Sequence, residues 1–257
     1  MSLIKYQTSD RIAYITLNRP QKRNALNEEM IDSLMNAFNE TKQDSSVKVV
    51  VLKAEGKVFS AGADLQYLQK LQNNSYQENL ADSKKLKELF QLIYTHDKVV
   101  IAQVQGHAIA GGCGLATVCD FVIAHPEARF GYSEVHIGFV PAIVMVYLLR
   151  RIGEGHAREL LLSGHLIEAT QALEWGLINR LVPAHSLEQQ VNDFAGKLVS
   201  GNSSESMKRI KTMIARVQEM SIEAALDFAV EQNARARNTD DCRQGISAFL
   251  NKVPIKW

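Results

Sequence analysis

Hydrophobic and polar residues alternate along the first part of the chain. Residues 4–8 and 12–17 both show a period of two, and the polar residues 9–11 separate them. This spacing is typical of β-strands, and the short turn between the two runs predicts a hairpin. Residues 47–54 are hydrophobic almost throughout, which predicts a strand buried on both faces of a sheet.

A helical spacing of hydrophobic residues lies between these strands, in residues 26–41. The positions are Met30, Ile31, Leu34, Met35 and Phe38. Asn27 is a favourable N-cap residue, and Glu28 and Glu29 complement the positive end of the helix dipole. Residues 80–94 repeat the spacing and predict a second helix. Strands and helices that alternate in this way predict an α/β architecture.

The pattern changes in the last third of the chain, which reads as helices only. Five amphipathic segments follow one another, in residues 169–175, 187–198, 204–217, 222–235 and 240–250. Before them we expect short strands at 121–124 and 128–132, and helices at 143–152 and 158–162 that Gly153 and Gly155 interrupt. We therefore expect an α/β body in residues 1–195 and a helical C-terminal region in residues 196–257.

A glycine-rich turn follows the predicted buried strand of residues 99–104. Its glycines are Gly106, Gly111, Gly112 and Gly114, and residues 115–118 resume a pattern that a helix can use. The backbone N–H groups at such a helix start can hold a phosphate or a developing oxyanion. Alternatively, the glycines only let the helix pack closely against the strand.

The sequence of this turn argues against nucleotide binding. A phosphate loop needs lysine and serine or threonine after its last glycine, and Gly112 and Cys113 occupy those positions. The dinucleotide fingerprint is also absent in register. Backbone donors without a lysine suit an uncharged carbonyl that becomes an oxyanion.

A second small-residue turn, residues 60–64, follows the buried strand of residues 47–54. The carboxyl ends of strands in an open α/β sheet are where ligands bind. One N–H group from each turn, aimed at one oxygen, would form an oxyanion hole. The polar segment 69–77 beyond this turn is a candidate lid over such a site.

Composition narrows the choice of partners. The 257 residues are 46% hydrophobic and 22% charged, with a net charge of +1, so neither nucleic acid nor a membrane surface is an expected partner. No hydrophobic run reaches the length of about 20 residues that spans a membrane, and the first residues lack a signal sequence. The three cysteines fit a reduced, cytoplasmic setting, and no histidine or cysteine pair has metal-ligand spacing, so we expect no metal.

Several motifs together resemble the enoyl-CoA hydratase/isomerase (crotonase) superfamily, and the likeness covers nearly the whole chain. They are L-N-R-P-Q-K-R-N-A-L-N near the start, F-S-A-G-A-D-L, Q-G-H-A-I-A-G-G-C-G-L, C-D-F-V-I-A, F-G-Y-S-E-V-H-I-G-F-V-P, W-G-L-I-N-R-L-V-P, and D-D-C-R-Q-G-I-S-A-F-L-N-K near the end. The resemblance implies a crotonase-like spiral of ββα units, a homotrimer or dimer of trimers, and an acyl-CoA thioester as substrate. It implies no cofactor, because coenzyme A is part of the substrate.

The resemblance also implies site residues. The hole donors fall on the N–H groups of Ala63 and Gly111, and Glu134 matches an acid/base carboxylate. Residues expected to line the CoA and substrate groove are Arg23, Ala25, Ala61, Gly62, Asp64, Leu65, Ile109, Gly112, Val135 and Ile137. Tyr67–Leu71 and residues 135–144 are expected to add pocket walls. Phe249 and Lys252 lie in a region where some members contact a neighbour's CoA.

Two departures from the family pattern bear on the reaction. Hydratases of the common type carry a second glutamate at the position of Gly114, and a glycine transfers no proton. Ala142 stands where hydroxyisobutyryl-CoA hydrolases, dienoyl-CoA isomerases and chlorobenzoyl-CoA dehalogenases have an aspartate, which argues against those activities. Glu134 is left as the one acid/base group.

A single carboxylate leaves more than one function open. We expect an enoyl-CoA hydratase, because the run S-E-V-H-I-G-F-V-P-A resembles bacterial methylglutaconyl-CoA hydratases of leucine breakdown. A Δ3,Δ2-enoyl-CoA isomerase, a decarboxylase or hydrolase of the same scaffold, and an acyl-CoA binder without turnover are the alternatives. His136 is a further catalytic candidate if the segment after Glu134 is extended. For His107, Tyr132 and Cys113 packing is the default role.

Overall fold

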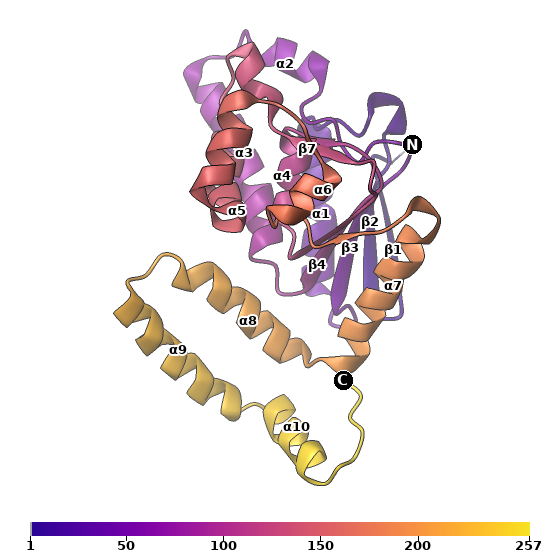
Figure 1. Cartoon of the computed structure of the whole chain (residues 1–257), viewed down its shortest axis with the longest axis vertical. Helices are drawn as coiled ribbons and strands as arrows, with labels where there is room; N and C mark the ends of the chain where they lie inside the picture. Colours follow the sequence, from indigo (N-terminus) through magenta and orange to yellow (C-terminus); the bar gives the residue numbers. More distant parts are fainter. Residues whose placement is uncertain (1) are drawn as a thin grey trace.

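A six-stranded sheet forms the centre of the body in the computed structural model, which describes residues 2–257 (Figure 1). In spatial order the strands are β1 (Ile4–Ser9), β2 (Ile12–Leu17), β3 (Val49–Ala54), β4 (Val99–Val104), β6 (Phe121–Ala124) and β9 (Arg180–Leu181). β1 is antiparallel to β2, and all other neighbours are parallel. The predicted hairpin and the predicted strands of this sheet are confirmed.

Helices cover both faces of the sheet, which explains why its central strands β3 and β4 are hydrophobic almost throughout. One face packs against α1 (Glu28–Gln43), α3 (Tyr76–Tyr94), α4 (Gly111–Thr117) and α5 (Ala142–Ser163). The other face packs against α7 (Ala184–Gly201) through Leu187, Val191 and Ala195. Consecutive residues of β4 alternate between these two cores: Val100 and Ala102 face α1 and α3, and Val99 and Ile101 face α7.

A small second sheet joins the segments that carry the candidate site. Its strands are β5 (Ala108–Ile109), β7 (Arg129–Gly131) and β8 (Ile167–Glu168), with β5 parallel to β7 and β8 antiparallel to β7. Two short helices connect this sheet to the rest of the body: η2 (Ser133–Ile137) follows β7, and α6 (Ala169–Glu174) follows β8. Two others lie elsewhere in the chain: η1 (Pro20–Lys22) follows β2, and α2 (Leu65–Leu71) follows β3. The β5–β7 pairing places the glycine-rich turn beside the chain that leads to Glu134.

Helix boundaries follow their capping residues, also in the polar segment 69–77, whose role as a lid stays a prediction. Asp64 caps α2 by accepting hydrogen bonds from the N–H groups of Gln66 and Tyr67. Ser75 and Glu78 form a capping box that begins α3 at Tyr76, so most of the segment is helical and only a short turn separates the two helices. Asn27 caps α1 as expected, and Gly153 interrupts α5 with a φ of 73°.

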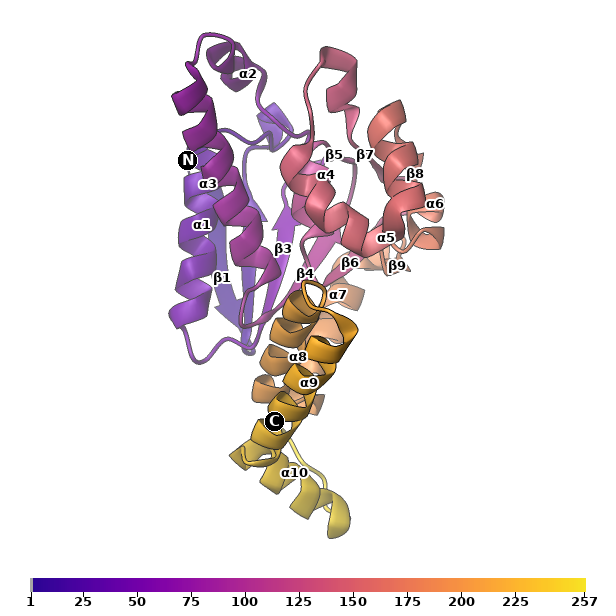
Figure 2. The ribbon, with the colours of Figure 1, turned by 90° about the vertical axis from the view of Figure 1, so that its left-hand side faces the viewer.

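The last three helices extend away from the body (Figures 1 and 2). These are α8 (Ser204–Val217), α9 (Ile222–Arg237) and α10 (Asp240–Leu250), and we call them the C-terminal arm. The arm exposes large hydrophobic side chains: Ile210, Ile214, Ile222, Leu226, Val230, Ile246, Phe249 and Leu250. A helical C-terminal region is thus confirmed. Its boundary at residue 195, within α7, stays a prediction.

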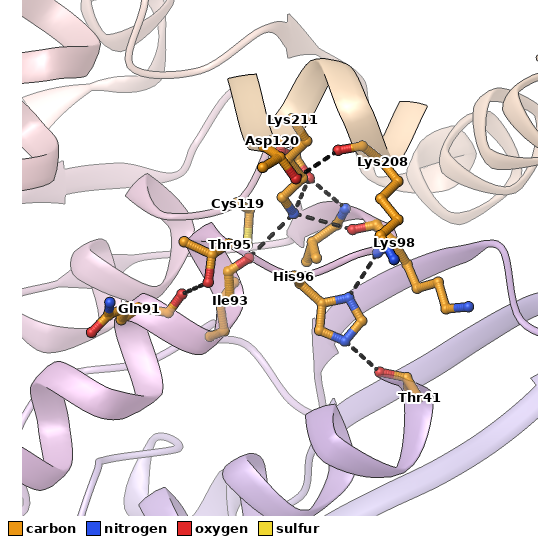
Figure 3. Close-up of polar contacts among 12 residues, drawn as sticks. Thr41, Gln91, Ile93, Thr95, His96, Lys98, Cys119, Asp120, Lys208 and Lys211 are labelled. Atoms are coloured by element: carbon orange, nitrogen blue, oxygen red, sulfur yellow. Dashed lines mark hydrogen bonds and ion pairs between the residues drawn. The ribbon is translucent and has the colours of Figure 1, made fainter. Parts of the chain in front are cut away.

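A buried lysine fastens the first arm helix to the body (Figure 3). The Lys211 ammonium donates to the carbonyl oxygens of Ile93 (3.2 Å) and Lys98 (3.1 Å) and to the Asp120 carboxylate (2.7 Å). Only 7% of the Lys211 side chain is exposed. His96 lies beside this cluster, and burial lowers the pKa of its ring to about 4. The arm is therefore anchored by charged hydrogen bonds as well as by hydrophobic contact.

Within residues 2–257, no helix combines the length and the hydrophobicity that a membrane span requires.

Replacement of Lys211 by methionine should destabilise the protein by about 3 kcal/mol, because it leaves the Asp120 carboxylate without its charged partner. Urea unfolding at neutral pH measures the loss. Lys208→Met is the matched control. Lys208 lies on the surface of the same helix as Lys211 and pairs with Asp97 of the body, so this substitution should cost less than about 1 kcal/mol. Equal losses for the two variants would contradict the anchoring role.

Candidate active site

The two small-residue turns lie backbone against backbone. Ser60 and Ala108 form a parallel bridge, and the N–H of Ile109 donates to the Ser60 carbonyl oxygen at 3.0 Å. A Cβ atom placed on Gly62 would lie 2.7 Å from the Ala110 Cβ and 3.4 Å from the Gly111 nitrogen. The turns are therefore in direct contact at Gly62 and Gly111, as the oxyanion-hole hypothesis requires.

The N–H groups of Ala63 and Gly111 donate no hydrogen bond within residues 2–257. In the bridge between Leu26 and Ala63, Leu26 is bonded to the Gly62 carbonyl and to the Asp64 N–H. The N–H of Ala63 therefore faces away from Leu26. Gly111 is the first residue of α4, where the N–H groups have no partner inside the helix. Both donors are thus available to a ligand.

Ala110, which precedes Gly111, has a backbone conformation that non-glycine residues rarely adopt, with φ 52° and ψ −126°. Its own N–H donates to the Gly131 carbonyl oxygen at 2.8 Å, and this bond ties the turn to β7. Strain of this kind persists only where the surrounding structure holds it, and it is concentrated at functional sites. Here it directs the chain into α4 with the Gly111 N–H exposed.

Glu134 follows β7, the strand to which the Ala110 N–H is bonded. It is the second residue of η2, three residues after Gly131, and its side chain is half-buried. The Glu134 Oε2 atom is buried and accepts no hydrogen bond from the described residues. Burial raises the pKa of this carboxyl above its ordinary value of 4.5. A buried carboxylate oxygen without a partner is suited to binding water or a substrate proton.

The structure also shows the surroundings of the four other candidate residues, which are Tyr132, Cys113, His136 and His107. The Tyr132 hydroxyl is fully buried and bonds to Thr117 Oγ1 at 2.8 Å. Burial raises the pKa of Cys113 to about 11, so this thiol stays protonated. The segment after Glu134 is a 3-10 helix and is not extended, so the condition for a catalytic His136 is not met. The His136 ring is exposed beside the Ser163 carbonyl oxygen. The side chain of His107 is exposed as well.

Asp64 and Arg19 hold the loop that precedes the first hole donor. Their side chains form a largely buried ion pair with an Nη1–Oδ2 distance of 2.7 Å. The Asp64 carboxylate is occupied by Arg19 and by the start of α2, and the expectation that Asp64 lines the groove stays a prediction. Sequence reasoning missed the role of Arg19. The motif L-N-R-P contained it, although nothing in the spacing linked it to Asp64.

Asn24 is a second structural residue that sequence reasoning missed. It is fully buried, and its side-chain amide donates to the carbonyl oxygens of Glu55 (2.9 Å) and Val58 (2.8 Å). The Ser60 hydroxyl donates to the Asn24 carbonyl oxygen at 2.9 Å. Asn24 therefore fixes the chain between β3 and the first hole donor.

The other predicted groove residues differ in exposure. Ala25, Gly62 and Gly112 are buried, Ala61 and Ile109 are half-buried, and Arg23, Leu65, Val135 and Ile137 are exposed. Phe249 and Lys252 are exposed at the end of the arm. A cavity of about 450 Å³ between α1 and α2 includes Asp64 and Tyr67, but its lining includes neither hole donor nor Glu134. In the described part of the chain, no three histidine, cysteine or carboxylate side chains gather into a possible metal site.

Gly114 faces a filled space. A Cβ atom on Gly114 would lie 2.5 Å from Val144 Cγ1 and 2.9 Å from Phe90 Cζ. Both side chains are buried, Phe90 on α3 and Val144 on α5. The missing second carboxylate therefore leaves no vacancy, because hydrophobic side chains occupy its place.

Two free N–H groups on adjacent turns of a mixed α/β fold, with a buried carboxylate oxygen on the segment after β7, form a geometry that can stabilise negative charge on a carbonyl oxygen. The profile of the enoyl-CoA hydratase/isomerase family matches residues 7–257. The chain therefore belongs to the enoyl-CoA hydratase/isomerase family, and it is an enzyme of that family. The resemblance and the crotonase fold inferred from the sequence are confirmed.

Individual relatives support the same assignment over the full length. The chain is 33% identical over 252 residues to the short-chain-enoyl-CoA hydratase of Clostridium acetobutylicum, covering 96% of this chain and 94% of that protein. It is 32% identical over 253 residues to the 2,3-dehydroadipyl-CoA hydratase of Escherichia coli, covering 98% and 97%. A crystal structure of enoyl-CoA hydratase from Mycobacterium smegmatis superimposes with a TM-score of 0.94, at 32% identity and covering 100% and 99%.

Replacement of Glu134 by glutamine should raise the melting temperature at pH 7.5. Burial raises the pKa of Glu134 in the folded state, so its ionisation costs stability at neutral pH, and this cost disappears once the pH falls below the pKa of the unfolded chain. Calorimetry at several pH values should show a gain that shrinks as the pH is lowered toward 4. Glu174→Gln, at an exposed site on α6, is the control and should show no such trend.

Proposed function

We propose that the chain catalyses the reversible addition of water to a 2-enoyl-CoA thioester, with Glu134 as its acid/base group. The observation that carries the proposal is the buried Glu134 Oε2 atom without a partner, on the segment that follows β7. The turn that bears the free Gly111 N–H is bonded to the same strand through the Ala110 N–H and the Gly131 carbonyl oxygen. The names of the Clostridium and Escherichia relatives support hydration of an enoyl-CoA.

The proposed reaction needs one carboxylate and one oxyanion hole. The thioester oxygen accepts hydrogen bonds from the N–H groups of Ala63 and Gly111. Glu134 takes a proton from water as the water oxygen bonds to C3, and the electrons of the C2–C3 double bond move to the thioester oxygen. The protonated Glu134 then gives the same proton to C2. Each hole donor can contribute about 3 kcal/mol to the enolate-like transition state.

The same residues also fit a Δ3,Δ2-enoyl-CoA isomerase, which is the second candidate. Gly114 favours it, because isomerisation needs only one carboxylate to take a proton from C2 and return it at C4. Purified protein is incubated separately with crotonyl-CoA, 3-methylglutaconyl-CoA and a 3-enoyl-CoA. Loss of enoyl absorbance with either of the first two supports hydration, and a gain with the third supports isomerisation. Binding without either change would make the chain an acyl-CoA binder.

We further propose that the chain forms a homotrimer or a dimer of trimers through its C-terminal arm. The exposed hydrophobic side chains of α8, α9 and α10 support this proposal, because an isolated chain rarely leaves so many together in water. A cytoplasmic location and 3-methylglutaconyl-CoA as the particular substrate rest on the sequence alone.

Replacement of Glu134 by glutamine should lower kcat by about a thousandfold and leave the affinity for the thioester nearly unchanged. In the parent protein, kcat/KM should fall at acidic pH with an apparent pKa above 4.5, since only the carboxylate accepts a proton and burial raises its pKa. Initial rates with crotonyl-CoA between pH 4.5 and 8 measure both effects. Turnover that survives the substitution would assign proton transfer to another group.

Replacement of Gly62 by alanine should lower kcat/KM about a hundredfold, the effect of losing one hole donor. Gly62 has a φ of 84°, and its new Cβ would force Ala110 and the Ile109 carbonyl away from the first turn. Gly155→Ala is the matched control, because no atom within 4 Å would meet the added Cβ. The hole hypothesis is contradicted if both variants keep the parent's rate with crotonyl-CoA.

A further inference from the structure

Three helices of the body meet in two successive layers of side chains. Gly114 of α4 contacts Phe90 of α3 and Val144 of α5, and we call these three residues the inner layer. About one helical turn further along each helix lie Thr117, Tyr94 and Tyr147, which we call the outer layer. The Tyr94 and Tyr147 rings contact each other, with their centroids 4.9 Å apart.

The outer layer borders a cavity that the hydration chemistry does not use. Tyr94, Thr117 and Tyr147 line a space of about 430 Å³ between the body and α8, and Ile210 and Ile214 of α8 complete its hydrophobic wall. Both tyrosine side chains are half-buried. The cavity lies at the carboxyl end of α4, whereas the Gly111 N–H lies at the amino end.

Along α4, the inner layer lies between the Gly111 N–H and this cavity. Gly114 is three residues beyond Gly111, or about 4.5 Å along the helix, and Thr117 is about 9 Å beyond it. Phe90 is fully buried and Val144 is 4% exposed, so the inner layer is closed by packed hydrophobic atoms. The absence of a side chain at position 114 is what allows Phe90 and Val144 to approach so closely.

We propose that Phe90 and Val144 form the floor of the acyl site and restrict the enzyme to short acyl chains, an inference that rests on the proposed function. An acyl group whose carbonyl oxygen binds the Gly111 N–H meets the inner layer one helical turn away. A longer chain would have to displace Phe90 or Val144 to reach the cavity behind them.

The test compares trans-2-enoyl-CoA substrates of four and ten carbons. The parent enzyme should have a kcat/KM at least tenfold higher for the shorter substrate. Phe90→Ala removes most of the floor and should raise the ten-carbon to four-carbon ratio about tenfold or more, because hydrophobic pockets discriminate by such factors per missing group. Val144→Ala should shift the ratio in the same direction from the opposite helix.

Leu89→Ala is the matched control, because Leu89 is equally buried on α3 but lies outside the inner layer. It loses a comparable side chain and should leave the chain-length ratio unchanged. Phe90→Leu keeps more of the packing and should shift the ratio by a smaller factor, so the test stands even where Phe90→Ala does not fold. A ratio unchanged in folded Phe90→Leu and Val144→Ala, or a parent enzyme that prefers ten carbons, would overturn the inference.

Calorimetric titration with butyryl-CoA and decanoyl-CoA separates this inference from the proposed function, because these saturated thioesters bind without reacting. A parent that prefers butyryl-CoA, with the preference reduced in Val144→Ala, upholds the floor even where no hydration is found. Hydration of crotonyl-CoA without any chain-length preference upholds the function and overturns the floor. A parent that binds neither thioester contradicts both.

Discussion

The close approach of two backbone turns is the constraint on which the candidate site depends. A Cβ atom on Gly106 would lie 1.9 Å from the Lys57 carbonyl oxygen, and one on Gly112 would lie 2.4 Å from the Ser60 carbonyl oxygen. No side chain fits between the turns at these positions, so the glycines are required for contact rather than for flexibility. Because the turns follow adjacent parallel strands, β3 and β4, the sheet itself brings them together.

The site stores unfavourable features that the rest of the body compensates. Ala110 has a strained backbone, and the Glu134 Oε2 atom is buried without a partner among the described residues. Around them the bonds are numerous: Asn24 holds the first turn, and the ion pair between Arg19 and Asp64 is largely buried. These hydrogen bonds and this ion pair compensate the cost of leaving two N–H groups and one carboxylate oxygen without partners in the folded protein. The unpartnered groups are the ones that the proposed reaction uses.

Much of the fold was predictable because local patterns control it. The period of two in β1 and β2, the continuous hydrophobic run of β3 and the Asn27 cap each specify their element from neighbouring residues. The short 3-10 helix at Glu134 was not predictable, since five residues carry no periodicity. The capping box of Ser75 and Glu78 was readable but overlooked. Glu134 and the hole donors came from resemblance to a family, whereas the Arg19–Asp64 pair depends on tertiary contact between distant segments.

The glycine at position 114 shows why a motif difference has to be interpreted in three dimensions. In the sequence it removes a carboxylate from the pattern of common hydratases. In the structure the surrounding volume belongs to Phe90 and Val144, which come from helices far apart in the chain. A glutamate at 114 would place a charge among buried hydrophobic atoms, which is costly without a partner. The absence of a side chain at position 114 and the packing of the inner layer therefore depend on each other, and this is why the proposed mechanism assigns proton transfer to Glu134 alone.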